Sequence, residues 1–190
     1  MNTKPASLGE TLFKYRDYTP LPLIALLFIF NDSTVRTAAA GLIFVVFGEL
    51  FRIYSVAFIG SISRTRKGNL GAKLITSGPF SFMRNPLYVG NFFITLGIAI
   101  FGGNPYVVAL SIVMFSFQYY HIVRYEEGLL FEAFGEEFQK FCQDVPAWIP
   151  KKKVELDKIE WPDNFSPALK SEKKTLMTIF SVIGILSLLA

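Results

Sequence analysis

Long apolar runs, separated by turn-forming or charged stretches, constrain the fold of this chain more than any other feature. A helix that crosses a lipid bilayer needs about 20 mostly apolar residues, within a range of about 17–25. The runs that reach or approach this length are residues 18–30, 35–62, 87–101, 106–123 and 175–190. They predict an all-α fold, namely a polytopic membrane helical bundle with about five membrane helices.

Charged residues are few and gather between the apolar runs. Only 18% of the 190 residues are charged, compared with about 25% in soluble domains. Lys and Arg are concentrated before residue 18, at residues 62–86 and after residue 123, whereas the connections at 31–34 and 102–105 carry none. Because positive residues favour the cytoplasmic side, the N-terminus and both basic segments are predicted to be cytoplasmic. The chain would thus have a cytoplasmic helical cap and a C-terminus on the opposite side.

The remaining composition excludes several kinds of site. Topology explains the net charge of +4, so no nucleic-acid partner is expected. The single cysteine, Cys142, is interpreted as a packing residue, and with a single histidine, His121, no metal site is expected. Neither Gly-x-x-x-x-Gly-Lys-Ser/Thr nor Gly-x-Gly-x-x-Gly occurs in the sequence.

Three segments follow from this pattern. Residues 1–150 are predicted to form the membrane core, 151–174 a polar cytoplasmic linker, and 175–190 a C-terminal membrane helix. The run at 18–30 is expected to be a retained helix, because Asn31-Asp32-Ser33-Thr34 follows it in place of a small-residue cleavage site.

The stretch at residues 74–90, LITSGPFSFMRNPLYVG, is too specific for simple anchoring. Gly78-Pro79 is a turn signal, and Pro86 suits the first position of a helix that Asn85 would cap. Such a helix start at the membrane surface suits an anionic or polar ligand. The alternative is a well-capped helix start with no ligand.

The stretch at residues 121–141 reads as a membrane helix that continues into the cytoplasm and bends near Gly135. Glu126 and Glu127 are adjacent and point about 100° apart on a helix, so they cannot both face one pocket. Glu126 is the candidate ligand-binding carboxylate. Glu127 would either form a surface pair with Arg124, three residues away, or serve the site.

Three other polar residues are open to two interpretations each. Glu49 and Arg52 lie within the second run, where charges are costly and are functional candidates by default. At this spacing they would either neutralise each other or belong to the site. His121 follows Tyr119 and Tyr120 and is either an interfacial anchor or a general base.

Two motifs resemble the signatures of a known enzyme family. The run SGPFSFMRNPLYVG resembles Gly-x-Tyr-x-x-x-Arg-His/Asn-Pro-x-Tyr-x-Gly, found in the integral-membrane methyltransferases that include isoprenylcysteine carboxyl methyltransferase and the phospholipid N-methyltransferases. Residues 126–150, EEGLLFEAFGEEFQKFCQDVPAWIP, resemble their second signature, and GELFRIYSVAFIG is similar to a weaker pattern that includes Arg52. The resemblance covers roughly residues 45–150.

The resemblance implies S-adenosylmethionine (SAM) as methyl donor, bound at the cytoplasmic membrane surface. A carboxylate such as Glu126 can accept hydrogen bonds from ribose hydroxyls or offset a cation. The positions that match the family's cofactor contacts are Ala72, Lys73, Leu74, Ile75, Phe80, Asn85, Pro86, Leu87, Tyr88 and Glu126.

Two departures from the family pattern bear on the site. Phe80 replaces a tyrosine, so any contact from its hydroxyl is lost. Ile122 stands where the prenylcysteine enzymes have an arginine that orients the acceptor carboxylate, and Arg124 lies about 200° around the helix from that position. Since an unpaired buried carboxylate is costly, the missing arginine favours a lipid amine as acceptor, and Asn85 in place of His points the same way.

The resemblance then implies a lipid or lipidated substrate in the bilayer. An ammonium acceptor must lose a proton, with help from Glu127, His121 or Tyr88, whereas Arg124 would serve an isoprenylcysteine-like carboxylate as the second possible acceptor. Two competing functions are an NADPH-dependent sterol-type reductase and a non-catalytic membrane scaffold.

Overall fold

The computed structural model describes residues 7–59, 73–150 and 159–190, and the regular structure of these residues is helical throughout. This confirms the predicted all-α class. The elements are α1 (Leu8–Tyr15), α2 (Leu21–Ile29), α3 (Val35–Ile59), the 3-10 helix η2 (Gly78–Ser81), α4 (Pro86–Phe101), α5 (Pro105–Phe134), α6 (Glu136–Asp144) and α7 (Ser166–Leu188).

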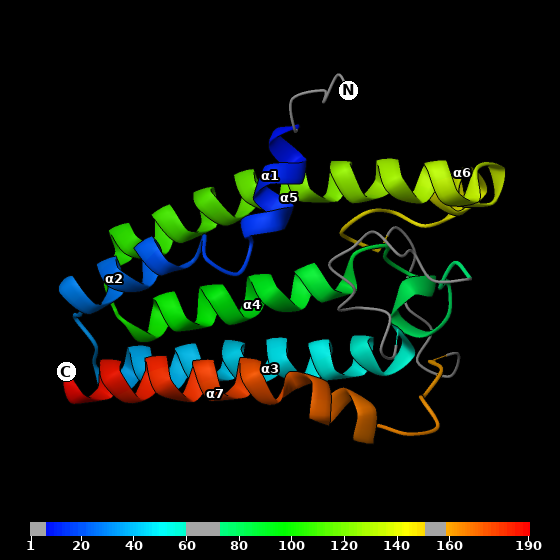
Figure 1. The fold of residues 1–190 in the computed structure, drawn as a ribbon. Coiled ribbons are helices and arrows are strands. Elements are labelled where there is room, and N and C mark those ends of the chain that lie inside the picture. Colours follow the sequence, from blue (N-terminus) through cyan, green and yellow to red (C-terminus); the bar gives the residue numbers. More distant parts are fainter. Residues whose placement is uncertain (1–6, 60–72, 151–158) are drawn as a thin grey trace.

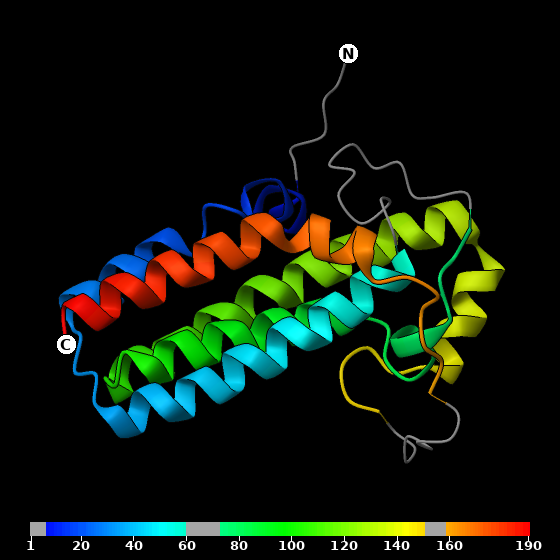
Figure 2. The same ribbon diagram turned by 90° about the horizontal axis from the view of Figure 1, so that it is seen from below.

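Four long helices, α3, α4, α5 and α7, run side by side and form a bundle (Figure 1). The short helices η2 and α6 and their connections gather at one end, which we call the cap end. At the opposite end, the apolar end, α2 and α7 finish and the α4–α5 turn lies. Figure 2 shows the same bundle from below, with α7 beside α2 at the apolar end. The α7 helix contacts α2, α3 and α4.

Two of these helices, α3 and α5, are long and apolar enough to cross a membrane, by length and composition. The α4 helix is apolar but has only 16 residues. The expected helix at residues 18–30 is shorter, because α2 has nine residues and starts after Pro20, with Pro22 in its first turn. A separate helix, α1, precedes it and crosses α5 (Figure 1). The total of five membrane helices stays a prediction.

Two pairs of glycines bring α3 and α4 into close contact. Gly41 and Gly48 lie seven residues apart on α3, and Gly90 and Gly97 have the same spacing on α4. A Cβ atom at Gly48 would lie 2.7 Å from the carbonyl oxygen of Gly90, and one at Gly97 would lie 2.7 Å from that of Gly41. Small residues of this kind allow two backbones to pack directly against each other, as in membrane helix pairs.

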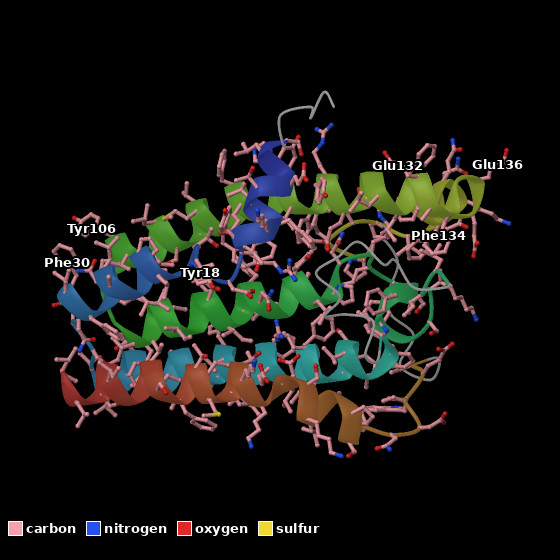
Figure 3. All side chains as sticks on the ribbon, viewed as in Figure 1. Tyr18, Phe30, Tyr106, Glu132, Phe134 and Glu136 are labelled. Carbon is pink, nitrogen blue, oxygen red and sulfur yellow. The ribbon has the colours of Figure 1, made fainter. Side chains whose placement is uncertain are left out.

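The apolar end is held together by aliphatic and aromatic packing. Its buried core consists of Leu23, Leu27, Ala99, Phe101, Val107, Val182 and Leu186. The predicted turn at 102–105 is confirmed, with Asn104 capping α5 by accepting hydrogen bonds from the backbone N–H groups of Tyr106 and Val107. Phe30 and Tyr106 lie at this end, whereas Glu132 and Glu136 lie at the cap end (Figure 3).

The predicted bend near Gly135 is also confirmed. Gly135 has a φ of +51°, which glycine adopts without steric cost, and it separates α5 from the amphipathic α6. At the C-terminal side, α7 begins at Ser166, well before the apolar run at 175–190. Hydropathy does not reveal this polar first part, although Pro167 in its first turn is typical of a helix start.

Candidate active site

The adjacent glutamates of the second signature point to different partners, as their spacing predicts. Glu126, half-buried on α5, accepts a hydrogen bond from the Tyr88 hydroxyl on α4. Glu127 pairs with Arg84, whose Nε and Nη2 atoms lie 2.9 and 2.8 Å from its Oε1 atom. The expected pair between Glu127 and Arg124 is therefore wrong, because Arg84 reaches Glu127 from the first signature.

Arg84 also binds the end of the second signature and so clamps the cap. Its Nη1 atom donates to the carbonyls of Val145, at 2.6 Å, and Cys142, at 3.3 Å. The backbone N–H of Arg84 donates to Pro146 at 2.9 Å. The two signatures are thus two sides of one hydrogen-bonded structure.

Asn85 extends this clamp in a way that the sequence did not predict. It occupies the N-cap position of α4, and Pro86 begins the helix as expected. However, its side chain makes no capping hydrogen bond, and its Nδ2 atom donates to the carbonyl of Ala147 at 3.1 Å. The Asn85 amide therefore connects the start of α4 to the segment after α6 and does not cap α4.

The positions that match the family's cofactor contacts differ in burial. Leu74, Phe80 and Pro86 are buried, Ile75, Leu87 and Tyr88 are half-buried, and Lys73 is exposed. Ala72 lies outside the described residues. Phe80 belongs to η2, which begins at Gly78. The backbone N–H of Gly78 donates to the Glu160 carboxylate at 3.0 Å and so holds the start of this helix.

An open cavity of about 300 Å³ lies between the segment before η2 and α6. Only Leu74 among the expected cofactor positions lines it, together with Thr76, Ser81, Glu137, Lys140, Phe141, Asp144 and Val145. Neither Glu126 nor Tyr88 contributes to this cavity. We place the candidate site at the Tyr88–Glu126 pair and not at the cavity, because residues of the two signatures meet at this pair.

The four candidate catalytic residues divide into two pairs. Tyr88 and Glu127 lie at the contacts just described. Arg124 is exposed, and its Nη1 atom donates to the Tyr120 hydroxyl at 2.8 Å. The ring of His121 lies against the rings of Phe117 and Tyr120, with centroid distances of 4.8 and 5.3 Å. Among the described residues, no contact joins His121 or Arg124 to the Tyr88–Glu126 pair.

A second polar cluster lies deeper in the bundle, around Arg52. Its Nη2 atom is 2.7 Å from the Oε2 atom of Glu172 on α7, which is 1% exposed. Its Nη1 atom donates to the amide oxygen of Asn91 on α4. Glu49, which the spacing suggests as a partner, forms an ion pair with Arg52 at 3.8 Å between Oε2 and Nε but no hydrogen bond. Sequence reasoning missed Asn91 and Glu172, which belong to no recognised motif.

The glycine that closes the first signature makes room for Arg52. A Cβ atom at Gly90 would lie 2.5 Å from the Cγ atom of Arg52. The aliphatic stem of Arg52 therefore passes α4 at Gly90, which has no side chain, and its guanidinium lies beside Asn91. This packing gives a physical reason for glycine at position 90, opposite Arg52 of the preceding helix α3.

Arg16 and Cys142 were not predicted from the sequence to be residues of the site. Arg16, after α1, donates from Nη1 to the Phe13 carbonyl at 2.9 Å. It lies close enough to Glu126 and Tyr88 for its charge to act on both. In the cap, burial raises the pKa of the Cys142 thiol.

Comparison with known proteins identifies the family of this chain. The sequence pattern of the phospholipid methyltransferase family matches residues 36–137. The protein-S-isoprenylcysteine O-methyltransferase of Schizosaccharomyces pombe is 31% identical over 146 residues, which are 75% of this chain and 60% of that protein. The human protein of the same name is 30% identical over 118 residues, covering 60% of this chain and 41% of its own.

The chain is also similar to proteins with a different name. The cobalt-zinc-cadmium resistance protein CzcN of Cupriavidus metallidurans is 30% identical over 121 residues, or 64% of this chain and 52% of that protein. The chain thus spans about half the length of the curated relatives it matches. Because the family pattern covers more than half of the chain, the protein belongs to the phospholipid methyltransferase family of membrane methyltransferases.

Proposed function

We propose that the protein transfers a methyl group from SAM to a lipid-borne acceptor at the cap end of the bundle. The observation that carries this proposal is the Tyr88–Glu126 pair, held between two signatures that Arg84 ties together. A half-buried carboxylate oriented by a tyrosine is suited to bind a polar cationic ligand.

The chemistry of these side chains fits SAM. SAM supplies a methyl group attached to a positively charged sulfonium. The carboxylate of Glu126 can offset that charge or accept hydrogen bonds from ribose hydroxyls. The rings of Tyr88 and Tyr119, whose centroids are 4.7 Å apart, add faces that attract cations.

The residues of this chain act by binding and orientation. Tyr88 fixes the rotamer of Glu126, and the Arg84–Glu127 pair holds α4, α5 and the segment after α6 at fixed positions. Transfer breaks the carbon–sulfur bond, whose electron pair stays on sulfur, and joins the methyl carbon to the acceptor in line. With an ammonium acceptor one proton must leave first, and Tyr88, Glu127 and His121 remain candidates to assist.

We propose that the protein lies in a membrane with the cap end and the N-terminus in the cytoplasm. Large exposed apolar side chains on α3, α5 and α7, such as Ile43, Val113 and Phe180, support a lipid environment, since soluble proteins rarely expose wide apolar surfaces. The distribution of Lys and Arg supports the orientation. Reporter fusions at Gly103 and Ala190 should both appear on the non-cytoplasmic side, and a cytoplasmic Ala190 fusion would overturn this topology.

The acceptor that we favour is a lipid amine. Ile122 is 0% exposed, so this position offers no cation for a carboxylate. Arg52 and Arg84 are already engaged with Glu172 and Glu127. An amine avoids this requirement, and nearby carboxylates can bind its positive charge.

One observation favours an isoprenylcysteine-like carboxylate as a second candidate. The positive charge of Arg16 acts on Glu126, and this residue is a candidate to supply the cation that position 122 lacks. Relatives named protein-S-isoprenylcysteine O-methyltransferase support the same candidate.

Binding measurements on the purified protein test the reaction class. Calorimetric titration should show binding of SAM and none of NADPH. Binding of NADPH alone would favour the reductase, and binding of neither would favour the scaffold.

Methyl-labelled SAM added to membranes that contain the protein distinguishes the acceptors. A carboxyl methyl ester releases labelled methanol in mild alkali, whereas an N-methyl group does not. Alkali-stable label in the lipid fraction supports the amine. Alkali-labile label that disappears in Arg16→Ala but persists in Arg124→Ala would establish the carboxylate.

A further inference from the structure

A continuous chain of side-chain contacts joins α7 to the candidate site. Glu172 accepts from Arg52, Arg52 donates to Asn91, and the Nδ2 atom of Asn91 lies 3.1 Å from the Tyr119 hydroxyl oxygen. The ring of Tyr119 then lies against that of Tyr88, the hydrogen-bond donor to Glu126. Glu172 lies beyond residues 36–137, the part that the family pattern matches.

The direction of the hydrogen bonds in this chain is determined by chemistry. A guanidinium has only donors, so Arg52 must face the oxygen of the Asn91 amide. The NH₂ group of Asn91 is consequently turned toward Tyr119 and donates to its hydroxyl oxygen. Tyr119 therefore acts as an acceptor here, and its own proton is left for another partner.

That proton has no acceptor in residues 7–59, 73–150 and 159–190. Tyr119 is half-buried between α4 and α5, with Phe115 stacked on it at 4.1 Å between centroids. A hydroxyl donor without a partner is costly in such a place. Tyr119 lies on the same face of α5 as Glu126, which is seven residues or about two turns further along the helix.

We propose that Tyr119 is a ligand-binding residue of this site and that its hydroxyl donates to an oxygen of the bound ligand. This inference rests on the proposed methyl transfer. The oxygen belongs either to SAM, as a carboxylate or ribose oxygen, or to the acceptor head group. Glu172, Arg52 and Asn91 are positioning residues, because they turn the proton of Tyr119 toward the ligand.

The variant Tyr119→Phe tests the proposal, since it keeps the ring and removes only the hydroxyl. Tyr120→Phe is the matched control, one position along and on the exposed face. SAM affinity is measured by calorimetry, and transfer by the initial rate of label incorporation in membranes at saturating SAM. A hydrogen bond to a charged or polar ligand predicts a tenfold to hundredfold loss, on the order of 1.5–3 kcal/mol, in one of these two quantities.

The two quantities distinguish the ligand. Weaker SAM binding in Tyr119→Phe assigns the contact to the donor, whereas slower transfer with unchanged SAM affinity assigns it to the acceptor. If both stay within twofold of wild type, the proposal is overturned. If wild-type protein binds no SAM, the proposed function itself fails, and this inference fails with it.

Asn91→Asp tests the direction of the chain. Aspartate still accepts from Arg52 but cannot donate, so it should accept the Tyr119 proton and withdraw it from the ligand. We expect the same loss as in Tyr119→Phe although the tyrosine is present, with a melting temperature close to that of wild type. Wild-type affinity and rate in this variant would overturn the positioning role of the chain. Asn91→Leu, which neither donates nor accepts, is expected to have a smaller effect, because the Tyr119 proton is then not captured.

Discussion

The two ends of the bundle are built from different interactions. At the apolar end, α2, α4, α5 and α7 meet through buried side chains such as Leu27 and Leu186. The polar pairs Tyr88–Glu126 and Arg84–Glu127 lie toward the cap end, where Arg84 also donates to the carbonyls at the end of α6. The difference indicates that the apolar end contributes mainly to stability, whereas the cap end contributes a preformed site.

The largest change in stability and in SAM binding is expected from Arg84→Ala, because Arg84 both stabilises the cap and holds the two signatures of the site together. The variant leaves Glu127 and the carbonyls of Val145 and Cys142 without their donors. Breaking such a pair costs roughly 3–5 kcal/mol when it is buried, and we expect the lower part of this range because both side chains are partly exposed. SAM binding should be lost together with a lower melting temperature. Normal SAM affinity would show that the clamp does not shape the site.

Leu186→Ala is the corresponding change at the apolar end. Leu186 is 0% exposed in the core around α2, α4 and α7. Truncation of a buried leucine costs about 2–5 kcal/mol, so the melting temperature should fall while SAM affinity at low temperature stays within twofold. A specific loss of SAM affinity in the folded protein would contradict the separation of the two ends.

A single hydroxyl at the cap end should matter more for binding than for folding. Tyr88→Phe removes the donor that orients Glu126. Loss of one hydrogen bond to a carboxylate predicts about tenfold weaker SAM binding, measured by calorimetry. Tyr106→Phe is the matched control, because Tyr106 is 84% exposed at the apolar end. Equal SAM affinities in Tyr88→Phe and Tyr106→Phe would contradict the claim that only the cap end serves binding.

The smallest effect is expected from Arg124→Ala. The side chain is exposed and bonds the Tyr120 hydroxyl, and surface contacts of this kind contribute about 0–1 kcal/mol. Stability and the rate of methyl incorporation should both stay close to wild type. A strong loss of transfer without loss of SAM binding would place Arg124 at the acceptor and revive its predicted catalytic role.

Local sequence patterns were sufficient to predict the elements that bear the site. Gly102-Gly103-Asn104-Pro105 marks a turn by itself, Gly135 marks the bend, and Pro86 marks the start of α4. The divergence of Glu126 and Glu127 follows from helical geometry alone. Each of these features depends on neighbours within a few residues.

Long-range partners could not be predicted in the same way. Arg52 and Glu172 are 120 residues apart, and Arg84 and Glu127 are 43 apart. No periodicity relates such residues, so local spacing suggests only the nearer charges, Glu49 and Arg124, as partners. The separation of α1 from α2 was missed for a related reason, since α1 is a short amphipathic helix that packs through Gly9 against the backbone of His121.

The central claim is that Glu126 binds SAM, and the most direct measurement is the SAM affinity of purified Glu126→Gln beside wild type. Glutamine keeps the size of the side chain and an oxygen for the Tyr88 hydroxyl, so the fold should persist and the melting temperature should change little. Loss of the negative charge predicts at least tenfold weaker binding of the cationic donor, in keeping with about 1.5–3 kcal/mol for a charged contact. Wild-type affinity in a variant of unchanged melting temperature would contradict the assignment of this site.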